Sequence, residues 1–144
     1  QHAIEYVQRH YGLFDVFVSL PATSPLRSAK DVSASIKQLK EQQGDICISV
    51  SPSSRNPYFN MVTLDEKGEC AIVNQSEGKM IRRQDAPAVY DITTVVYTST
   101  PVFILNNSGL FDGKVVAIEV PKERAVDIDD IYDFTMAEAI IKCH

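Results

Sequence analysis

Several features that mark common classes of protein are missing from this sequence. No apolar run approaches the ~20 residues that a membrane-spanning helix needs, and no segment resembles a secretory signal. The three cysteines, Cys47, Cys70 and Cys143, are widely separated and form no CxxC pair. They are typical of small buried hydrophobic residues in a reducing compartment, so a cytoplasmic location is predicted.

An excess of positive charge and the common catalytic motifs are missing as well. Lys and Arg number 14 against 19 Asp and Glu, and the net charge of −5 argues against nucleic-acid binding. The sequence holds no glycine-rich phosphate loop, and its three histidines suggest neither a Ser-His-Asp nor a Cys-His arrangement. The 144 residues suffice for one domain with a core, and 44% of hydrophobic residues is ordinary for a globular protein.

The first residues have the pattern of a helix that lacks its beginning. Apolar residues between Ala3 and Tyr11 fall on one helical face, and Gly12 is a suitable C-terminal stop. No capping residue precedes Ala3, since the chain opens with Gln1. We therefore expect residues 1–144 to be the C-terminal part of a single domain of a longer protein.

The chain is organised around residues 15–27, DVFVSLPATSPLR. Residues 16–20 form a short apolar run, which predicts a central strand of a parallel sheet. Pro21 ends the strand, and a proline-stiffened loop leads into the next helix. Ligands of open α/β sheets bind at the carboxyl ends of strands, so this loop is a candidate wall of a binding site; a purely structural connection is the alternative. Arg27 is expected to anchor the loop rather than to touch a ligand.

Strand and helix patterns alternate along most of the remaining chain. The sequence Ser28-Ala29-Lys30-Asp31 matches a capping box, and the apolar stripe after it predicts a helix that ends at Gly44. Together with the strands on either side, this helix makes a βαβ unit. Further strands are expected at residues 46–50, 90–98 and 114–120, a short helix at 102–105, and a last helix from about residue 130 with Phe134, Ala137 and Ile141 on one face. This order predicts a Rossmann-like α/β fold, with a mixed, mostly parallel sheet flanked by helices.

Residues 52–89 interrupt this order with an antiparallel pattern. Residues 58–64 and 70–73 are predicted to form a hairpin with Gly68 at the left-handed position of its turn. A polar stretch follows, and then the sequence MIRRQDAP with two adjacent arginines. We expect an inserted β subdomain that serves as a lid or as a dimerisation arm.

Carboxylates gather before the last helix. Asp127 and Asp129 are separated by one residue, which on an extended segment points both carboxylates to the same side. Two hard oxygen ligands suit Mg²⁺, which takes one or two carboxylates together with substrate phosphates. The residues alone favour a simpler interpretation, in which Asp129 or Asp130 caps the helix and the neighbouring acids favour its positive end.

Arg82, Arg83 and Gln84 form another polar constellation. An arginine fork binds a carboxylate or a phosphate through two parallel hydrogen bonds. A solvated loop with weak surface ion pairs explains the same residues, and the residues alone favour that interpretation.

The motifs ATSPLR, RRQDAP and AVDID, in this order and spacing, resemble those of the acylneuraminate cytidylyltransferases, or CMP-sialic acid synthetases. The resemblance extends from about Leu20 to Ile141. Members of this family transfer the cytidylyl group of CTP to the anomeric hydroxyl of a nonulosonic acid and release pyrophosphate. The resemblance implies a nucleotidyltransferase with a fold of the nucleotide-diphospho-sugar transferase type, active as a homodimer, that supplies activated sugar for surface glycans.

The resemblance also implies a role for the acidic pair. Asp127 and Asp129 would bind Mg²⁺ at the triphosphate, with Asp129 as the catalytic carboxylate. This implication favours metal binding over helix capping at these two positions.

Substrate contacts follow from the same resemblance. Arg83 and Gln84 would extend from the inserted arm, with Arg83 reaching the sugar carboxylate in the neighbouring subunit's site. Tyr97 and Phe111 would wall the sugar pocket, and Thr23 would lie on the sugar side of the loop.

The sequence departs from the family pattern in two respects. The family's basic, glycine-containing nucleotide loop is missing, so the nucleotide-binding residues are expected upstream of Gln1 and residues 1–144 alone are expected to be inactive. Pro21 stands where many members have glutamine, and residues 91–94, DITT, replace an Arg-Pro-Asn-Gly run. A legionaminic-type acid is therefore an alternative acceptor. A cytidylyltransferase for 3-deoxy-octulosonate, or a binding and assembly module without catalysis, are the remaining interpretations.

Overall fold

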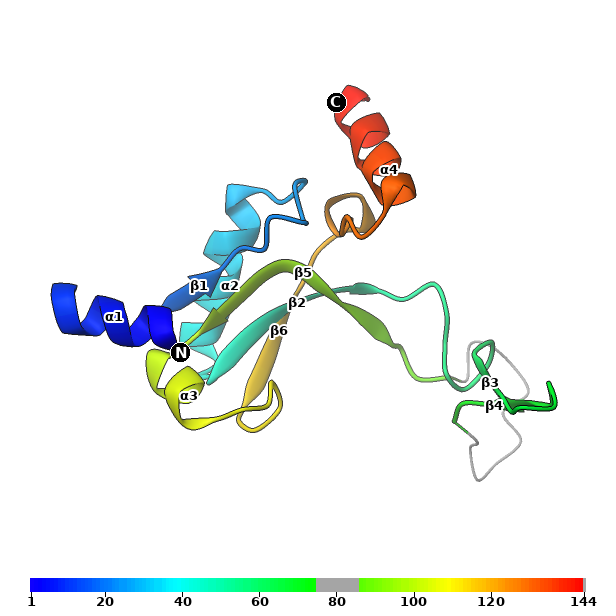
Figure 1. The fold of residues 1–144 in the computed structure, drawn as a ribbon, viewed down its shortest axis with the longest axis horizontal. Coiled ribbons are helices and arrows are strands. Elements are labelled where there is room, and N and C mark those ends of the chain that lie inside the picture. Colours follow the sequence, from blue (N-terminus) through cyan, green and yellow to red (C-terminus); the bar gives the residue numbers. More distant parts are fainter. Residues whose placement is uncertain (75–85, 144) are drawn as a thin grey trace. The chain divides into compact units, whose positions relative to one another are not determined.

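The computed structural model describes residues 1–74 and 86–143. The chain divides into two compact units, unit 1 with Gln1–Ser51 and Ile92–His144, and unit 2 with Pro52–Asp91 (Figure 1). The helices are α1 (His2–Tyr11), α2 (Ala29–Glu41), α3 (Pro101–Asn106), the 3₁₀ helix η2 (Lys122–Arg124) and α4 (Ile131–Lys142). The strands are β1 (Phe17–Ser19), β2 (Ile46–Pro52), β3 (Val62–Leu64), β4 (Cys70–Ile72), β5 (Tyr90–Ser99) and β6 (Val115–Glu119).

Unit 1 is built on a four-stranded mixed sheet in the order β1-β5-β2-β6. β1 runs antiparallel to β5, with Ser19 opposite Tyr97, and β2 runs parallel to β6, with Ile46 opposite Val115. The prediction of a central, parallel strand at residues 16–20 is therefore wrong, because within the described sheet β1 is an edge strand and its side chains are only half-buried. β5 lies between β1 and β2, and this long-range pairing is not visible in the local sequence of β1.

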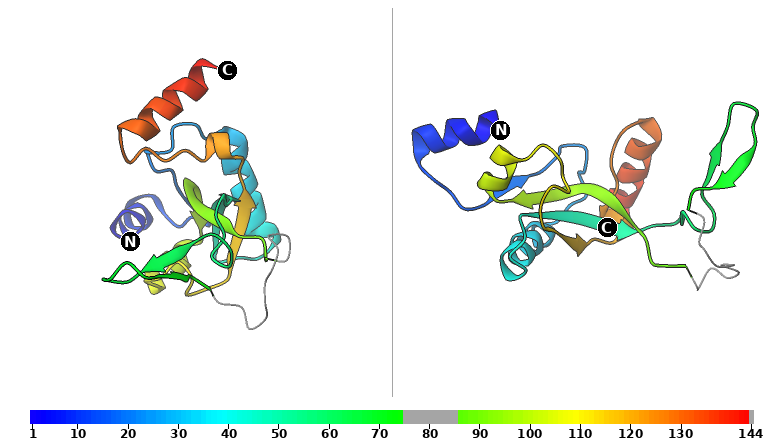
Figure 2. Two further views of the ribbon diagram at one scale, coloured as in Figure 1. Left: turned by 90° about the vertical axis from the view of Figure 1, so that its right-hand side faces the viewer. Right: turned by 90° about the horizontal axis from the view of Figure 1, so that it is seen from below.

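Helices cover both faces of this sheet (Figure 2). Ile46 and Ile48 of β2 pack with Phe103 of α3 on one face. On the other face, the buried Ser35 of α2 donates a hydrogen bond to the Thr98 hydroxyl of β5 at 2.7 Å. The sheet is thus enclosed on both sides, which confirms the predicted mixed α/β architecture.

The helices of unit 1 begin close to the predicted residues, but α2 ends at Glu41, before the predicted stop at Gly44, and the left-handed residue that follows it is Gln43, with a φ of +49°. Ser28 Oγ accepts a hydrogen bond from the Asp31 amide, and the Asp31 carboxylate accepts one from the Ser28 amide at 2.8 Å. α1 ends at Gly12, whose φ of +95° favours glycine. α3 begins with Pro101, where a missing N–H leaves no hydrogen bond unmade.

The two terminal helices bury less of their apolar surface than their patterns suggest. α1 buries Ile4, whereas Tyr11 on the same predicted face is 79% exposed. α4 buries Ala137, but Phe134 and Ile141 on its predicted inner face are more than half exposed. No helix in the described part of the chain is both long and apolar enough to cross a membrane.

Unit 2 contains the predicted hairpin. β3 and β4 pair antiparallel, with Leu64 opposite Cys70. The Asp65 carboxylate accepts hydrogen bonds from two backbone N–H groups of the turn. Gly68 in this turn has a φ of +83°. The strands are shorter than predicted because the residues before Val62 form turns instead.

Candidate functional site

Three segments of unit 1 meet where β1 and β6 end. They are the loop after β1, the part of β5 around Thr94, and the segment that follows β6. The Thr23 carbonyl accepts a hydrogen bond from the Ile128 amide at 2.8 Å. The Ser24 and Thr94 hydroxyls are hydrogen-bonded at 2.5 Å. The loop after β1 is therefore fastened both to β5 and to the segment that carries the acidic pair.

The loop after β1 is also held from within. Arg27 Nη2 donates a hydrogen bond to the Pro21 carbonyl, as expected for a residue that anchors the loop. Ser24 is buried, whereas Thr23 is exposed. A fixed backbone thus presents an accessible hydroxyl at position 23, where the sequence predicts a substrate contact.

Asp127 lies in the segment after β6 and is half-buried. Its Oδ1 atom is buried and has no hydrogen-bond partner among the described residues. A buried carboxylate oxygen without a donor is energetically costly, so this atom is suited to a partner that the protein itself does not provide. A cation is such a partner.

The helix-capping role falls on Asp130. Its Oδ1 accepts hydrogen bonds from the Tyr132 amide at 2.7 Å and from the Asp133 amide at 3.0 Å. The Asp133 carboxylate in turn accepts from the amides of Asp129 and Asp130. Because these two carboxylates cap α4, the exposed carboxylate of Asp129 is not needed for that purpose.

The acidic pair fits an incomplete ligand set for Mg²⁺. Among the residues that the structure describes, no cluster of three His, Cys, Asp or Glu side chains could hold a metal ion by itself. Asp127 and Asp129 would supply one or two oxygens, and the rest would come from water and substrate phosphates. Mg²⁺ commonly binds in this way.

Tyr97 lies on β5 opposite Ser19, near the end of β1. Burial raises the pKa of Tyr97, and the negative charge of Asp127 raises it further. The phenol is therefore kept protonated and remains a hydrogen-bond donor. The electrostatic influence of Asp127 on Tyr97 links the predicted sugar pocket to the predicted cation site.

The structure does not bring every predicted site residue to this place. Phe111 is 66% exposed and lies in the loop before β6, whereas Asp127 follows that strand. Arg83 and Gln84 lie outside the described residues. Their roles stay predictions.

One pair of residues near the site is not apparent from the sequence. Arg124 of η2 donates to the Asp31 carboxylate through Nε at 3.0 Å and through Nη2 at 2.8 Å. Burial alone would raise the pKa of Asp31, but the hydrogen bonds from Arg124 and Ser28 outweigh it and lower the pKa. The capping box reveals Asp31, but no local pattern points to a partner so far along the chain.

Comparison with known proteins gives this arrangement a context. The chain is 30% identical over 129 residues to the post-translational flagellin modification protein B of Campylobacter coli, which covers 90% of this chain. It is 30% identical over 128 residues, 89% of this chain, to the CMP-N,N'-diacetyllegionaminic acid synthase of Campylobacter jejuni. An N-acylneuraminate cytidylyltransferase of Streptococcus agalactiae is 29% identical over 118 residues, 82% of this chain. Over most of its own length the chain is thus similar to members of the acylneuraminate cytidylyltransferase family.

The match to this family concerns part of each relative. The chain spans about half the length of the Campylobacter proteins, 54% and 53%, and 28% of the Streptococcus protein. No protein-family model matches the chain.

A solved structure shares the fold. The 4-diphosphocytidyl-2C-methyl-D-erythritol synthase of Anaerococcus prevotii superimposes with a TM-score of 0.61 over 97% of this chain and 64% of its own, at 11% identity. The structure thus has a nucleotidyltransferase-type α/β fold, as the resemblance implied.

Proposed function

We propose that the protein transfers the cytidylyl group of CTP to the anomeric hydroxyl of a nonulosonic acid. The observation that carries this proposal is the buried, unpartnered oxygen of Asp127, next to an exposed Asp129 and to the Thr23 loop, in a chain that is similar to members of this family. The names of two relatives refer to CMP-diacetyllegionaminic acid and to acylneuraminate. In the reaction, the anomeric oxygen attacks the α-phosphorus of CTP, its proton passes to solvent water, and the bond to pyrophosphate breaks.

The residues of this chain would chiefly bind and orient the substrates. Little covalent chemistry falls to the protein in such transfers, so positioning and charge neutralisation dominate. Asp127 and Asp129 would hold a Mg²⁺ ion, which when bound neutralises charge on the phosphates. Thr23 and the protonated Tyr97 would contact the sugar acid as hydrogen-bond donors.

The acceptor within this class depends on positions where the chain departs from the family pattern. Pro21 lacks the amide side chain of glutamine, and residues 91–94 lack arginine. Thr94 instead hydrogen-bonds to Ser24 beneath the loop. We therefore place a legionaminic-type acid beside N-acetylneuraminic acid as an acceptor to be tested.

Unit 2 is proposed as the element through which two subunits associate. Its hairpin exposes apolar side chains: Val62 and Leu64 on β3, and Phe59 and Met61 before it. Exposed apolar residues at this density mark interaction surfaces. In a homodimer, Arg83 and Gln84 of one subunit would complete the sugar site of the other.

The decisive experiment replaces Asp129 by asparagine. Asp129→Asn removes a negative oxygen ligand of the cation while the helix cap at Asp130 is kept, so circular dichroism should be unchanged. Loss of several kcal/mol of charge stabilisation predicts a fall in kcat/KM of about 100-fold or more. Pyrophosphate release with CTP, Mg²⁺ and a panel of keto-sugar acids measures it in the whole protein, since residues 1–144 alone are expected to be inactive.

Glu123→Gln is the matched control, since it neutralises an exposed carboxylate of η2 in the same segment. It should leave transfer unchanged. Near-normal pyrophosphate release by Asp129→Asn would contradict the proposed cation site. Turnover of 3-deoxy-octulosonate with none of the nine-carbon acids would contradict the proposed acceptor class.

A further inference from the structure

The segment that carries the acidic pair is attached at two separate points to the stretch of chain between Thr23 and Asp31. One is the hydrogen bond from the Ile128 amide to the Thr23 carbonyl. The other is the ion pair between Arg124 of η2 and Asp31 at the start of α2. On one segment, Asp127 lies between Arg124 and Ile128. On the other segment, most of the loop after β1 lies between Thr23 and Asp31. The two segments therefore form a closed ring, which restricts both more strongly than either contact alone.

The geometry of the ion pair fixes the orientation of Arg124 relative to Asp31. Arg124 uses Nε and Nη2 toward both carboxylate oxygens of Asp31, and such a fork fixes direction as well as distance. The Asp31 side chain is 5% exposed, and that of Arg124 is 35% exposed. Asp31 Oδ2 also accepts from the Ser28 amide and hydroxyl, so the carboxylate is itself held rigidly.

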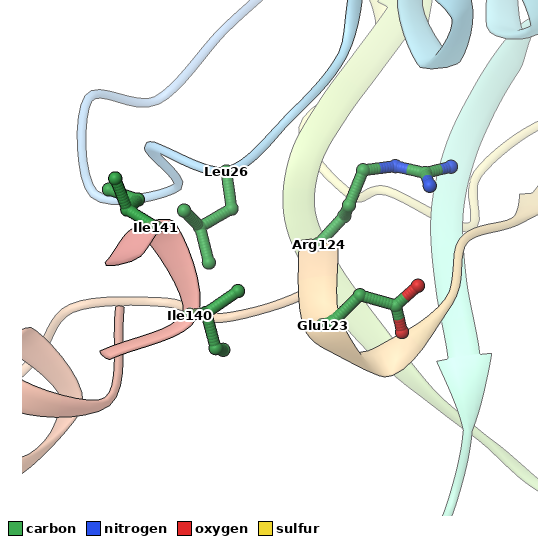
Figure 3. A pocket seen from close by; sticks show the side chains of 5 residues that line it. All are labelled: Leu26, Glu123, Arg124, Ile140 and Ile141. Carbon is green, nitrogen blue, oxygen red and sulfur yellow. The ribbon is translucent and has the colours of Figure 1, made fainter. Parts of the chain in front are cut away.

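The surroundings of Arg124 include apolar side chains and one further charged group. A cavity of about 350 Å³ lies beside it, lined by Leu26, Ile140 and Ile141 together with Glu123 and Arg124. Figure 3 shows the three apolar side chains facing one another, while the Arg124 side chain extends away from them. The Glu123 carboxylate lines the same cavity and interacts electrostatically with Arg124, while Nε and Nη2 of Arg124 donate their hydrogen bonds to Asp31.

We propose that Arg124, through its ion pair with Asp31, is a positioning residue that holds Asp127 and Asp129 against the Thr23 loop for cation binding. This inference rests on the proposed function. Arg124 touches no substrate in this role. It acts by fixing the backbone of residues 124–128, and with it the position of Asp127 and of Asp129, which directly follows Ile128, before a cation arrives. Partners that orient metal ligands in this way typically change metal affinity by about 10–100-fold when they are removed.

The experiment measures local order and cation binding separately. In Arg124→Gln, amide hydrogen exchange at Ile128 should accelerate at least about tenfold, because the ring is open. Exchange at Val120, whose amide donates to the Val50 carbonyl at 2.8 Å in the core, should not change. The dissociation constant for Mn²⁺, measured by electron paramagnetic resonance, should rise about 10–100-fold. Arg124→Lys keeps the positive charge but loses the two-pronged contact. Both the acceleration of exchange at Ile128 and the loss of Mn²⁺ affinity should therefore be smaller than in Arg124→Gln.

The control breaks an ion pair on the same helix. Lys37 and Glu41 of α2 are paired at 3.7 Å and largely exposed, so Lys37→Gln should change neither exchange at Ile128 nor Mn²⁺ affinity.

Three results would overturn the inference. The first is unchanged amide exchange at Ile128 in Arg124→Gln. The second is an equal acceleration of amide exchange at Val120, which indicates general destabilisation. The third is unaltered Mn²⁺ affinity despite faster exchange at Ile128. Absence of Mn²⁺ binding by the unmodified whole protein, with and without CTP, would instead contradict the proposed function, which separates the two failures.

Discussion

Asp127 and Asp129 have different surroundings although a single residue separates them. Asp127 is half-buried with one oxygen enclosed and unpartnered, whereas Asp129 is exposed and its amide is bound by Asp133. A cation bound to both would be held by one carboxylate fixed in the protein and one open to substrate. This asymmetry is what a site completed by a phosphate ligand requires.

The effect of the Asp127 charge should be measurable as a change in the pKa of Tyr97. Because burial and the charge of Asp127 both raise the pKa of Tyr97, Asp127→Asn should lower that pKa, while burial keeps it above the ordinary value. Titration of ¹³C-labelled tyrosine by NMR, assigned with Tyr97→Phe, measures the change. Asp129→Asn is the matched control and should leave the Tyr97 titration in place, and an unmoved titration in Asp127→Asn would contradict the coupling.

The same shift has a consequence for stability. The folded-state pKa of Tyr97 lies above its unfolded value near 10, so the phenol contributes stability that is present below pH 10. That contribution is lost as the pH rises through the folded-state pKa. The decline in stability above pH 10 should therefore be smaller in Tyr97→Phe than in the unmodified protein.

At the scale of single elements, the start of α4 separates helix capping from cation binding. Asp130 accepts two amide hydrogen bonds at the helix start, so Asp130→Ala should cost about 1 kcal/mol of stability. Urea denaturation measures this loss. Asp129→Ala should leave the unfolding midpoint nearly unchanged, because its carboxylate caps nothing. Equal destabilisation by both variants would show that Asp129 also supports the helix.

The loop after β1 illustrates how an element acquires its role from its neighbours. Its own sequence supplies two prolines and the Arg27 anchor to Pro21, which make it stiff. Its place in the site depends on Thr94 of β5 and Ile128 after β6. Both partners are distant in sequence, so a stiff loop is predictable and its function as a wall of this site is not.

At the scale of the whole molecule, the prediction concerns association through unit 2. Leu64 is 68% exposed on β3, and burial of such a side chain in an interface contributes about 2 kcal/mol. Leu64→Lys should therefore raise the dimer dissociation constant roughly 30-fold. Sedimentation equilibrium measures it.

A lysine at a comparably exposed residue of unit 1 provides the control. Val102 on α3 is also 68% exposed, and Val102→Lys should leave the association unchanged. Equal effects of the two variants, or a monomeric unmodified protein, would contradict the assignment of unit 2 as the dimerisation arm.

The sequence by itself was enough for most helices and strands of this protein. Local signals such as the Ser28–Asp31 capping box, Pro101 and the Gly68 turn act over a few residues, and all three occur in the structure as expected. The mixed α/β class and the similarity to the family also follow from the sequence, because element order and ordered motifs are properties of the chain. For the acidic pair, the sequence left capping and cation binding as alternatives.

Only the tertiary structure decided which strands are neighbours and how the candidate site is held. β1 pairs with β5 at the edge of the described sheet, Asp130 rather than Asp129 caps α4, and Arg124 reaches Asp31. Each of these outcomes depends on which side chains and strand edges remain free once the chain has packed. Contacts between residues far apart in sequence leave no periodic signal, so they become visible only when the chain is folded.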